Sequence, residues 1–276
     1  MATAATYAQF VLGTPGAGKS TYCAGMSEFM RLLKRKCVVV NLDPANDRLP
    51  YECAVDIREL VRLEDVMERH TPEAGDAEES FGLGPNGGLV FCIEYLEKNL
   101  DWLRSALKPF ESQWILFDCP GQVELYTVHT SMRNIFRAIT NDWQWRTACV
   151  HLVDVAHCLD ASRYISALLL SLTAMLHLEL PHVNVLSKID QLRQFGRLPL
   201  GLQFYSEVLN LQHLVMLLEQ DPMTARFTAL NSALCNLIEE FGLVRFVPLK
   251  IENKHSVFRL LQEVDRSVGY ADDNTA

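Results

Sequence analysis

The sequence predicts an α/β fold, in which a mostly parallel sheet is flanked by helices on both faces. Short apolar runs, of the kind found in strands buried on both faces of a sheet, recur along the chain. Segments with helical periodicity separate these runs, and this alternation is typical of strand–helix–strand units. The hydrophobic fraction of 49% and the charged fraction of 21% are ordinary for a globular protein, which excludes collagen-like, disordered and coiled-coil structures.

The expected elements follow one another in regular order. Strands are expected at 7–12, 37–42, 114–117, 148–153, 182–186 and 243–247. Helices are expected between and after them, at 19–33, 122–140, 161–180, 203–219 and 255–266. The basic run Lys34-Arg35-Lys36 suits the C-terminal end of the first helix, because the helix dipole favours cations there.

The length of 276 residues fits a single domain over 1–276 with an elaborate insert. Residues 44–112 separate the second and third expected strands, and they are too many for one crossover helix. We expect this insert to be helical, with helices near 56–69 and 89–107. Its polar, acidic stretch 71–80 is expected to be mobile.

The composition also restricts the kinds of partner. The chain has 34 acidic and 25 basic residues, and a surface with a formal charge of −9 repels phosphate backbones, so we expect no direct binding to nucleic acid. The cysteines form no C-x-x-C pair and the N-terminus has no signal-peptide pattern, which predicts reduced thiols in an intracellular protein. The apolar stretch 164–178 is shorter than a bilayer span, so no membrane segment is expected.

A phosphate-binding loop is predicted between the first expected strand and the first expected helix. Residues 13–20, Gly-Thr-Pro-Gly-Ala-Gly-Lys-Ser, match G-x-x-x-x-G-K-[ST] at every fixed position. The glycines let main-chain amides wrap phosphate oxygens, Lys19 can reach the terminal phosphates, and the Ser20 hydroxyl can bind Mg²⁺. The alternative is a glycine-rich turn without a ligand. The candidate phosphate-binding residues are Gly16, Ala17, Gly18, Lys19, Ser20 and Thr21.

Two carboxylates are expected beside this loop because each follows a predicted strand. Asp118 begins Asp-Cys-Pro-Gly-Gln and suits the Mg²⁺-linked carboxylate of a P-loop enzyme, while Gly121 allows a close approach to the γ-phosphate and Gln122 can orient water. Asp43, in Asn-Leu-Asp-Pro-Ala, can orient or deprotonate the attacking water. The alternatives are a Pro-Gly turn at 118–122 and an Asp-Pro turn cap at Asp43.

Ser187-Lys188-Ile189-Asp190 follows the strand expected at 182–186. It is similar to the N-K-x-D segment of G proteins, whose Asp accepts both donors of the guanine edge and rejects adenine by leaving its own lone pairs unpaired. Ser187 stands at the Asn position, so one contact to the base is shortened or lost. The alternative is an exposed loop that happens to carry a Lys and an Asp. We interpret the segment as guanine recognition.

Gly84-Pro85-Asn86-Gly87-Gly88 lies inside the insert. Its local chemistry predicts a tight turn, in which Asn-Gly adopts positive φ.

The ordered set of motifs resembles that of the GPN-loop GTPases, closest to the second eukaryotic paralogue of that family. The set comprises G-x-P-G-x-G-K-S, N-L-D-P-A, G-P-N-G-G, D-C-P-G-Q-V-E and S-K-I-D. The resemblance covers nearly the whole chain, and Gly-Pro-Asn within a helical insert is its most specific part. It implies a P-loop fold that binds GTP or GDP with Mg²⁺ and hydrolyses GTP.

The resemblance also implies roles for individual residues and partners. Ser20 and Asp118 correspond to the metal region, Asp43 and Gln122 to catalytic-water positions, and Asn86 to a residue that reaches the partner's site in a dimer. The implied partner is a second copy or a sister GPN-loop GTPase. The implied cellular role is assembly and nuclear localisation of RNA polymerase II and III, by a cytoplasmic protein that also passes to the nucleus.

Two other functions stay open on the sequence. One is a P-loop kinase that phosphorylates a small molecule, although the Arg residues form no evident cluster that would cover the phosphates. The other is a nucleotide-dependent binding scaffold without significant turnover.

Overall fold

The computed structural model describes residues 5–68, 83–196 and 198–270. The chain divides into two compact units, of which the first comprises Met1–Pro15 and Lys19–Thr147, and the second Gly16–Gly18 and Ala148–Ala276. The stretch 71–80, expected to be mobile, lies outside the described residues. The single domain over 1–276 stays a prediction.

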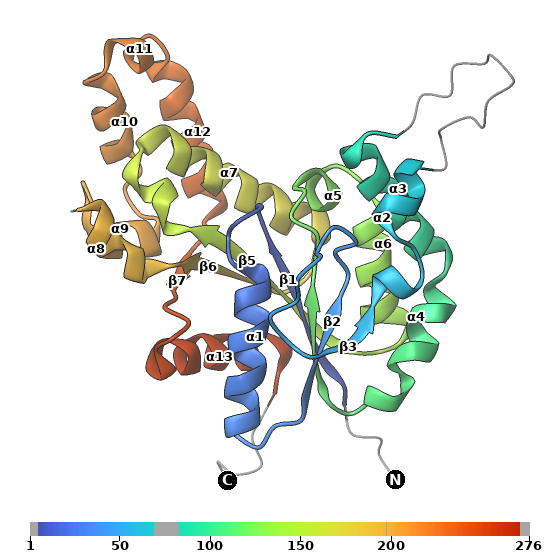
Figure 1. Ribbon diagram of the computed structural model, residues 1–276. Helices are drawn as coiled ribbons and strands as arrows, with labels where there is room; N and C mark the ends of the chain where they lie inside the picture. The colour runs from blue at the N-terminus through green and yellow to red at the C-terminus, as the bar shows by residue number, and fades with distance from the viewer. Residues whose placement is uncertain (1–4, 69–82, 197, 271–276) are drawn as a thin grey trace, which may run out of the picture. The chain divides into compact units, whose positions relative to one another are not determined.

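The first unit contains a parallel sheet whose strands follow the order β3-β2-β4-β1 (Figure 1). These strands are β1 (Tyr7–Gly13), β2 (Cys37–Asn41), β3 (Cys53–Asp56) and β4 (Trp114–Asp118). Its helices are α1 (Lys19–Leu32), α2 (Leu63–Glu68), α3 (Pro85–Lys98), α4 (Leu100–Leu107), α5 (Glu124–Thr127) and α6 (Ser131–Arg137). Asn41 lies opposite Asp118 in the register, so the carboxyl ends of β2 and β4 are neighbours.

Helices cover both faces of this sheet. Gln9 and Phe10 are consecutive on β1, so their side chains point to opposite faces. The Tyr22 hydroxyl of α1 donates to Gln9 Oε1 at 2.7 Å on one face. On the other face, the ring of Phe10 stacks on Phe136 of α6 with centroids 3.8 Å apart.

The second unit has a parallel sheet in the order β5-β6-β7. Its strands are β5 (Arg146–Asp154, whose first two residues are grouped with the first unit), β6 (His182–Ser187) and β7 (Phe246–Pro248). Its helices are α7 (Ala161–Leu178), α8 (Leu192–Phe195), α9 (Gly201–Glu207), α10 (Gln212–Glu219), α11 (Pro222–Ala225), α12 (Thr228–Phe241) and α13 (Lys254–Val268).

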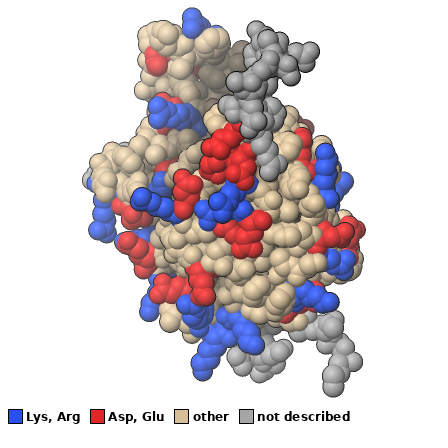
Figure 2. All heavy atoms as spheres, turned by 45° about the vertical axis from the view of Figure 1, so that its right-hand side comes forward, with Lys and Arg blue, Asp and Glu red and all other residues tan. Residues whose placement is uncertain are grey.

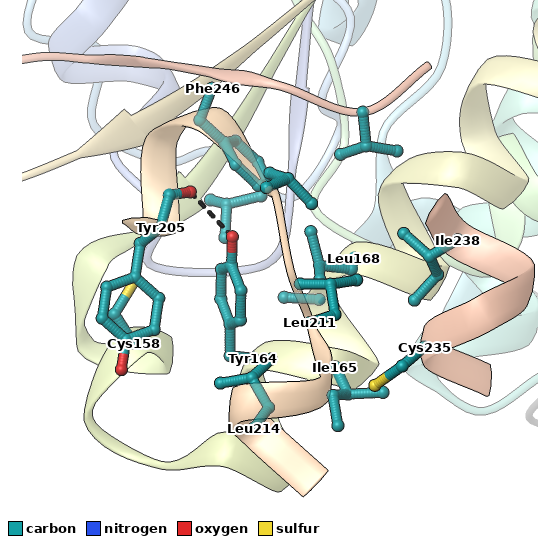
Figure 3. Close-up of a cluster of buried hydrophobic side chains, with 14 of the residues drawn as sticks. Cys158, Tyr164, Ile165, Leu168, Tyr205, Leu211, Leu214, Cys235, Ile238 and Phe246 are labelled. Carbon is teal, nitrogen blue, oxygen red and sulfur yellow. Dashed lines mark hydrogen bonds between the residues drawn. The ribbon is translucent and has the colours of Figure 1, made fainter. Parts of the chain in front are cut away.

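A buried apolar cluster joins α7 to the helices and strands around it (Figure 3). Tyr164 and Leu168 of α7 pack with Leu214 of α10, Ile238 of α12 and Phe246 of β7. The Tyr164 hydroxyl is buried, and it donates to the carbonyl oxygen of Tyr205 at 2.7 Å, which removes the cost of burying an unpaired polar group. Helices α7, α10 and α12 are therefore held by one shared core.

Helix α7 is also long and apolar enough, by length and composition alone, to cross a membrane, with 18 residues and a mean hydropathy of 1.2. Much of its buried face belongs to the core cluster of the second unit, namely Tyr164, Ile165, Ala167, Leu168 and Leu172, and a core helix of this kind passes the same test. The expectation that no segment spans a membrane stays a prediction.

The charges are mixed on the face of the molecule that Figure 2 presents. Figure 2 shows acidic and basic side chains interspersed among uncharged residues on the face that it presents. The formal charge of −9 therefore does not form one continuous acidic field over the described residues of that face.

The predicted fold class is confirmed, since both units contain parallel strands flanked by helices. Five of the six predicted strands lie where they were expected, and β7 begins at Phe246 instead of 243. The insert 44–112 is not wholly helical, because β3 adds to the edge of the first sheet. This strand of four residues is too short for its pattern to stand out.

Several predicted helices are interrupted. The helix predicted at 203–219 is two helices, α9 and α10, because the chain takes left-handed φ values of 55° at Val208 and 57° at Asn210. The Val208 side chain is 6% exposed within the core cluster, so packing outweighs the unfavourable backbone of a β-branched residue. The helix predicted at 122–140 is likewise divided into α5 and α6, and α12 was not predicted.

Candidate functional site

The phosphate loop has the strand–loop–helix context that its motif requires. β1 ends at Gly13 and α1 begins at Lys19, while Gly16 and Gly18 take φ values of 77° and 98° that side chains other than glycine rarely adopt. Lys19 is 8% exposed, and its Nζ donates to the carbonyl oxygens of Gly13 at 3.2 Å and Thr14 at 3.4 Å. The lysine is thus folded back on the loop. Thr21 is exposed in the first turn of α1.

The turn after β4 lies against this lysine. A Cβ atom built at Gly121 would be 2.9 Å from Lys19 Nζ and 3.2 Å from the main chain of Pro15. Only a glycine fits such an approach without a shift of the backbone. Gln122 follows, and its Oε1 is buried with no hydrogen-bond partner in the described part of the chain. The Pro-Gly turn therefore contacts the lysine and leaves an acceptor available for a ligand.

Ser20 and Asp118 belong to a network of polar side chains in the first unit. Asn46 Nδ2 donates to Ser20 Oγ at 3.1 Å and to Asp118 Oδ2 at 3.4 Å. The Tyr51 hydroxyl donates to the same Oδ2 at 2.8 Å. Asp118 is 1% exposed, and its other oxygen, Oδ1, is buried without a hydrogen-bond partner among the described residues. An unpaired carboxylate oxygen in this position needs a ligand to compensate its burial.

This network fits Mg²⁺, a hard cation that binds oxygen. Within the described ranges, no group of three or more His, Cys, Asp or Glu residues could hold a metal. A P-loop protein requires no such group, because Mg²⁺ keeps several waters and binds phosphate oxygens besides one hydroxyl and one carboxylate. Burial raises the pKa of Asp118, while hydrogen bonds from Ser20 and Tyr51 and the charge of Lys19 lower it.

Asp43 is half-buried at the end of β2. Its Oδ1 accepts a hydrogen bond from the main-chain amide of Ala45 at 3.0 Å, so the turn-cap interpretation is confirmed for this oxygen. The Asn41 side chain makes two hydrogen bonds with the Asp43 main chain. Its Nδ2 donates to the Asp43 carbonyl oxygen at 3.1 Å, and its Oδ1 accepts from the Asp43 amide at 3.2 Å. Burial raises the pKa of Asp43, against the opposing effects of the Ala45 amide and Lys19. Its role in orienting water stays a prediction.

The predicted base motif belongs to the second unit, which also contains Gly16–Gly18. Ser187 is 5% exposed, and its Oγ lies 2.8 Å from the carbonyl oxygen of Ala17 and 3.2 Å from that of Val153, to which it can donate. Lys188 has a left-handed φ of 59°, and its Nζ pairs with Asp154 Oδ2 at 2.7 Å. Asp190 is exposed in the short 3-10 turn that follows. Ser187 therefore contacts protein main chain, and Asp190 is accessible.

The Gly-Pro-Asn segment is not the tight turn that local chemistry predicted. It forms the first turn of α3, with Gly84 as the capping residue and Pro85 at the first position, where a missing amide hydrogen costs nothing. A Cβ atom at Gly88 would lie 2.7 Å from the Leu63 side chain, so this glycine allows α3 to pack closely on α2. Asn86 is exposed on this turn and is not among the residues that contact Lys19 or Asp118.

Three polar residues of these networks were not among the predicted site residues. Asn46 and Tyr51 follow Asp43 in the loop before β3, and nothing in their spacing indicated that they contact Asp118. Asp154 ends β5, and its position at the carboxyl end of a predicted strand is a sequence signal for a residue near a ligand.

A protein-family profile described as "Conserved hypothetical ATP binding protein" matches residues 11–270. "GPN-loop GTPase 2" of Danio rerio is 52% identical over 264 residues, which cover 96% of this chain and 81% of that protein. "GPN-loop GTPase QQT1" of Arabidopsis thaliana is 51% identical over 265 residues, 96% of this chain and 85% of that protein.

A solved structure is also similar. It is that of a GTPase from Pyrococcus abyssi in apo form, with a TM-score of 0.74 and 23% identity, over 96% of this chain and 98% of that one. At this identity the likeness supports the fold alone. With relatives above 50% identity over nearly its whole length, the chain belongs to the GPN-loop GTPase family.

Proposed function

We propose that this chain binds GTP with Mg²⁺ at the phosphate loop and hydrolyses it to GDP and phosphate. The observation that carries the proposal is the buried, unpartnered Oδ1 of Asp118, in the network that also contains the Ser20 hydroxyl. The names of the relatives support GTP as the nucleotide. The description of the family profile names ATP instead, but it calls these proteins hypothetical. The predicted base motif favours guanine.

The residues of the first unit would act by electrostatics and positioning. Lys19 and the main-chain amides of the loop stabilise negative charge on the β- and γ-phosphates. Ser20 and Asp118 would hold Mg²⁺, which neutralises charge on the phosphates when it is bound. Gln122 Oε1 and Asp43 are the acceptors that would orient the attacking water.

Base selection is assigned to Asp190. Its exposed carboxylate can accept both donors of the guanine edge, and an adenine would leave that carboxylate without these bonds. Ser187 contributes little to binding of the base in this proposal, because its hydroxyl donates its hydrogen bond to a main-chain carbonyl oxygen.

The test of this function is phosphate release from GTP and ATP, measured side by side over a range of protein concentrations. We expect release from GTP in the presence of Mg²⁺ and little from ATP. Equal release from ATP would contradict the assignment of Asp190. Phosphate transferred to an added small acceptor would favour the kinase, and nucleotide binding without release would favour the scaffold.

We further propose that the active form is a dimer with a second copy or a sister GPN-loop GTPase. The exposed position of Asn86 at the start of α3 leaves its amide available to a partner. Asn86→Ala should lower turnover per chain without weakening GTP affinity, and Lys98→Ala, an exposed residue in the last turn of α3, is the control. Turnover of Asn86→Ala equal to that of the natural protein would remove Asn86 from the proposal.

The proposed cellular role, assembly and nuclear localisation of RNA polymerase II and III, rests on the family resemblance alone. It is tested by depleting the protein and following the polymerase subunits between cytoplasm and nucleus. Cytoplasmic accumulation that the natural protein reverses, and Lys19→Ala does not, is expected. Unchanged localisation would contradict the role and leave the nucleotide chemistry untouched.

A further inference from the structure

The loop between β2 and β3, residues 42–52, is hydrogen-bonded to the two side chains that the proposed function assigns to Mg²⁺. Asn46 Nδ2 lies 3.1 Å from Ser20 Oγ and 3.4 Å from Asp118 Oδ2. Tyr51, near the other end of the loop, donates to Asp118 Oδ2 at 2.8 Å. The position of this loop is therefore linked directly to what these oxygens bind.

The two contacts differ in how they would respond to a cation. Asn46 directs the positive end of an N–H dipole at Ser20 Oγ, the oxygen that would bind the metal itself. An N–H donor and a cation compete for the same oxygen. Tyr51 contacts Oδ2 of Asp118 and leaves Oδ1, the oxygen without a partner, available.

We propose that Asn46 is the metal-responsive contact of the loop 42–52 and that Tyr51 is its permanent tether. Loading of Mg²⁺ weakens the Asn46 hydrogen bond and loosens the first part of the loop, while Tyr51 keeps the second part attached to Asp118. The inference rests on the proposed function, because it takes Ser20 and Asp118 as the metal-binding side chains. Both residues act through Ser20 and Asp118, so they are positioning residues.

Thermodynamic linkage predicts the direction in which a change at Asn46 should alter the affinity for Mg²⁺. If Mg²⁺ weakens the Asn46 contact, then that contact weakens Mg²⁺ binding by the same factor. Removal of the amide should therefore tighten the binding of Mg²⁺. A residue that simply supported the metal site would have the opposite effect.

The first experiment titrates Mg²⁺ against the rate of GDP release from the purified protein. Asn46→Ala should lower the Mg²⁺ concentration at half-maximal effect about five-fold, the size expected for one neutral hydrogen bond. Asn46→Leu, which is close in shape to Asn but has no donor, should shift the Mg²⁺ midpoint in the same direction and serves as the test if the alanine variant folds poorly. Asn134→Ala is the control, since it removes an exposed amide that bonds Glu97 in the same unit.

The second experiment follows amide hydrogen exchange in the loop of the GDP-bound protein, with and without Mg²⁺. In the natural protein, Mg²⁺ should raise amide exchange at 45–48, and in Asn46→Ala the exchange of these amides should be high in both states. Tyr51→Phe should raise exchange at 49–53 in both states and preserve the response to Mg²⁺. Tyr95→Phe, an exposed tyrosine of α3, is the control.

The outcomes separate this inference from the proposed function. Failure of GDP to bind, or a GDP release rate that Mg²⁺ does not affect, would overturn both. If Mg²⁺ slows release in the natural protein but Asn46→Ala leaves the midpoint unchanged or raises it, the inference is wrong and the proposed function stands.

Discussion

The proposed metal network of the first unit, which is centred on Asp118, and the predicted base motif of the second use their polar groups in opposite ways. In the first unit, Asp118 has one oxygen engaged by Asn46 and Tyr51 and one buried oxygen without a partner in the described structure. In the second unit, Ser187 donates to main-chain carbonyls and Lys188 pairs with Asp154.

The two regions therefore obtain their specificity for a ligand in different ways. A buried carboxylate oxygen without a partner costs stability in the absence of a ligand, which is a common feature of binding sites. In the base motif, most of the polar groups already stabilise the protein itself. In the proposed function, selection of the base then depends chiefly on Asp190, the exposed carboxylate at the end of the motif.

The largest effect is expected from a change in the first unit, at Lys19. Lys19→Ala removes the one side-chain cation of the phosphate loop, so we expect turnover of GTP to fall about 100- to 1000-fold or more. Lys36→Ala, which removes an exposed charge after α1, should leave turnover unchanged. Phosphate release measures both variants, and circular dichroism verifies that they fold. Normal hydrolysis by Lys19→Ala would refute the assignment of the loop.

The next effect tests the second unit, at Asp190. Asp190→Asn replaces an acceptor-only carboxylate by an amide, so two charge-assisted hydrogen bonds to guanine are lost or weakened and GTP affinity should fall about 100-fold. Affinity for xanthosine triphosphate should rise, because xanthine has a carbonyl where guanine has an amino group. Glu240→Gln, an exposed carboxylate of α12, is the control. Unchanged preference between the two nucleotides would mean that Asp190 does not contact the base.

The sequence predicted the features that depend on local patterns and missed the contacts that depend on the fold. The fold class and the phosphate loop were predictable, because they depend on local patterns: buried runs of β-branched residues, and glycines at fixed spacing before a helix. The contacts of Asn46 and Tyr51 with Asp118 were not, because they join residues about 70 positions apart through a loop without regular structure. The segment 187–190 was predicted to recognise the base, with one contact shortened or lost at Ser187, and only the fold reveals that two main-chain carbonyls lie within reach of the Ser187 hydroxyl.

The smallest effect is expected from Ser187→Ala, which tests whether the Ser187 hydroxyl stabilises the protein or binds the base. Ser187→Ala removes the hydrogen bond to the Ala17 or Val153 carbonyl and leaves a buried acceptor unpaired, so the free energy of unfolding should fall by about 1–2 kcal/mol. Ser171→Ala is the matched control, because Ser171 is equally buried but bonds a carbonyl of its own helix, and we expect a change below about 0.5 kcal/mol. Urea unfolding gives both values.

The preference of Ser187→Ala for GTP over ATP is then the deciding measurement. If Ser187 acts on the protein main chain, the variant is less stable but discriminates between the two nucleotides as well as the natural protein does. A loss of discrimination with full stability would mean that the hydroxyl turns to the base when nucleotide binds. The base motif would then resemble the metal network, with a polar group that changes partner on binding, and Asp190 would no longer be the chief determinant of base selection.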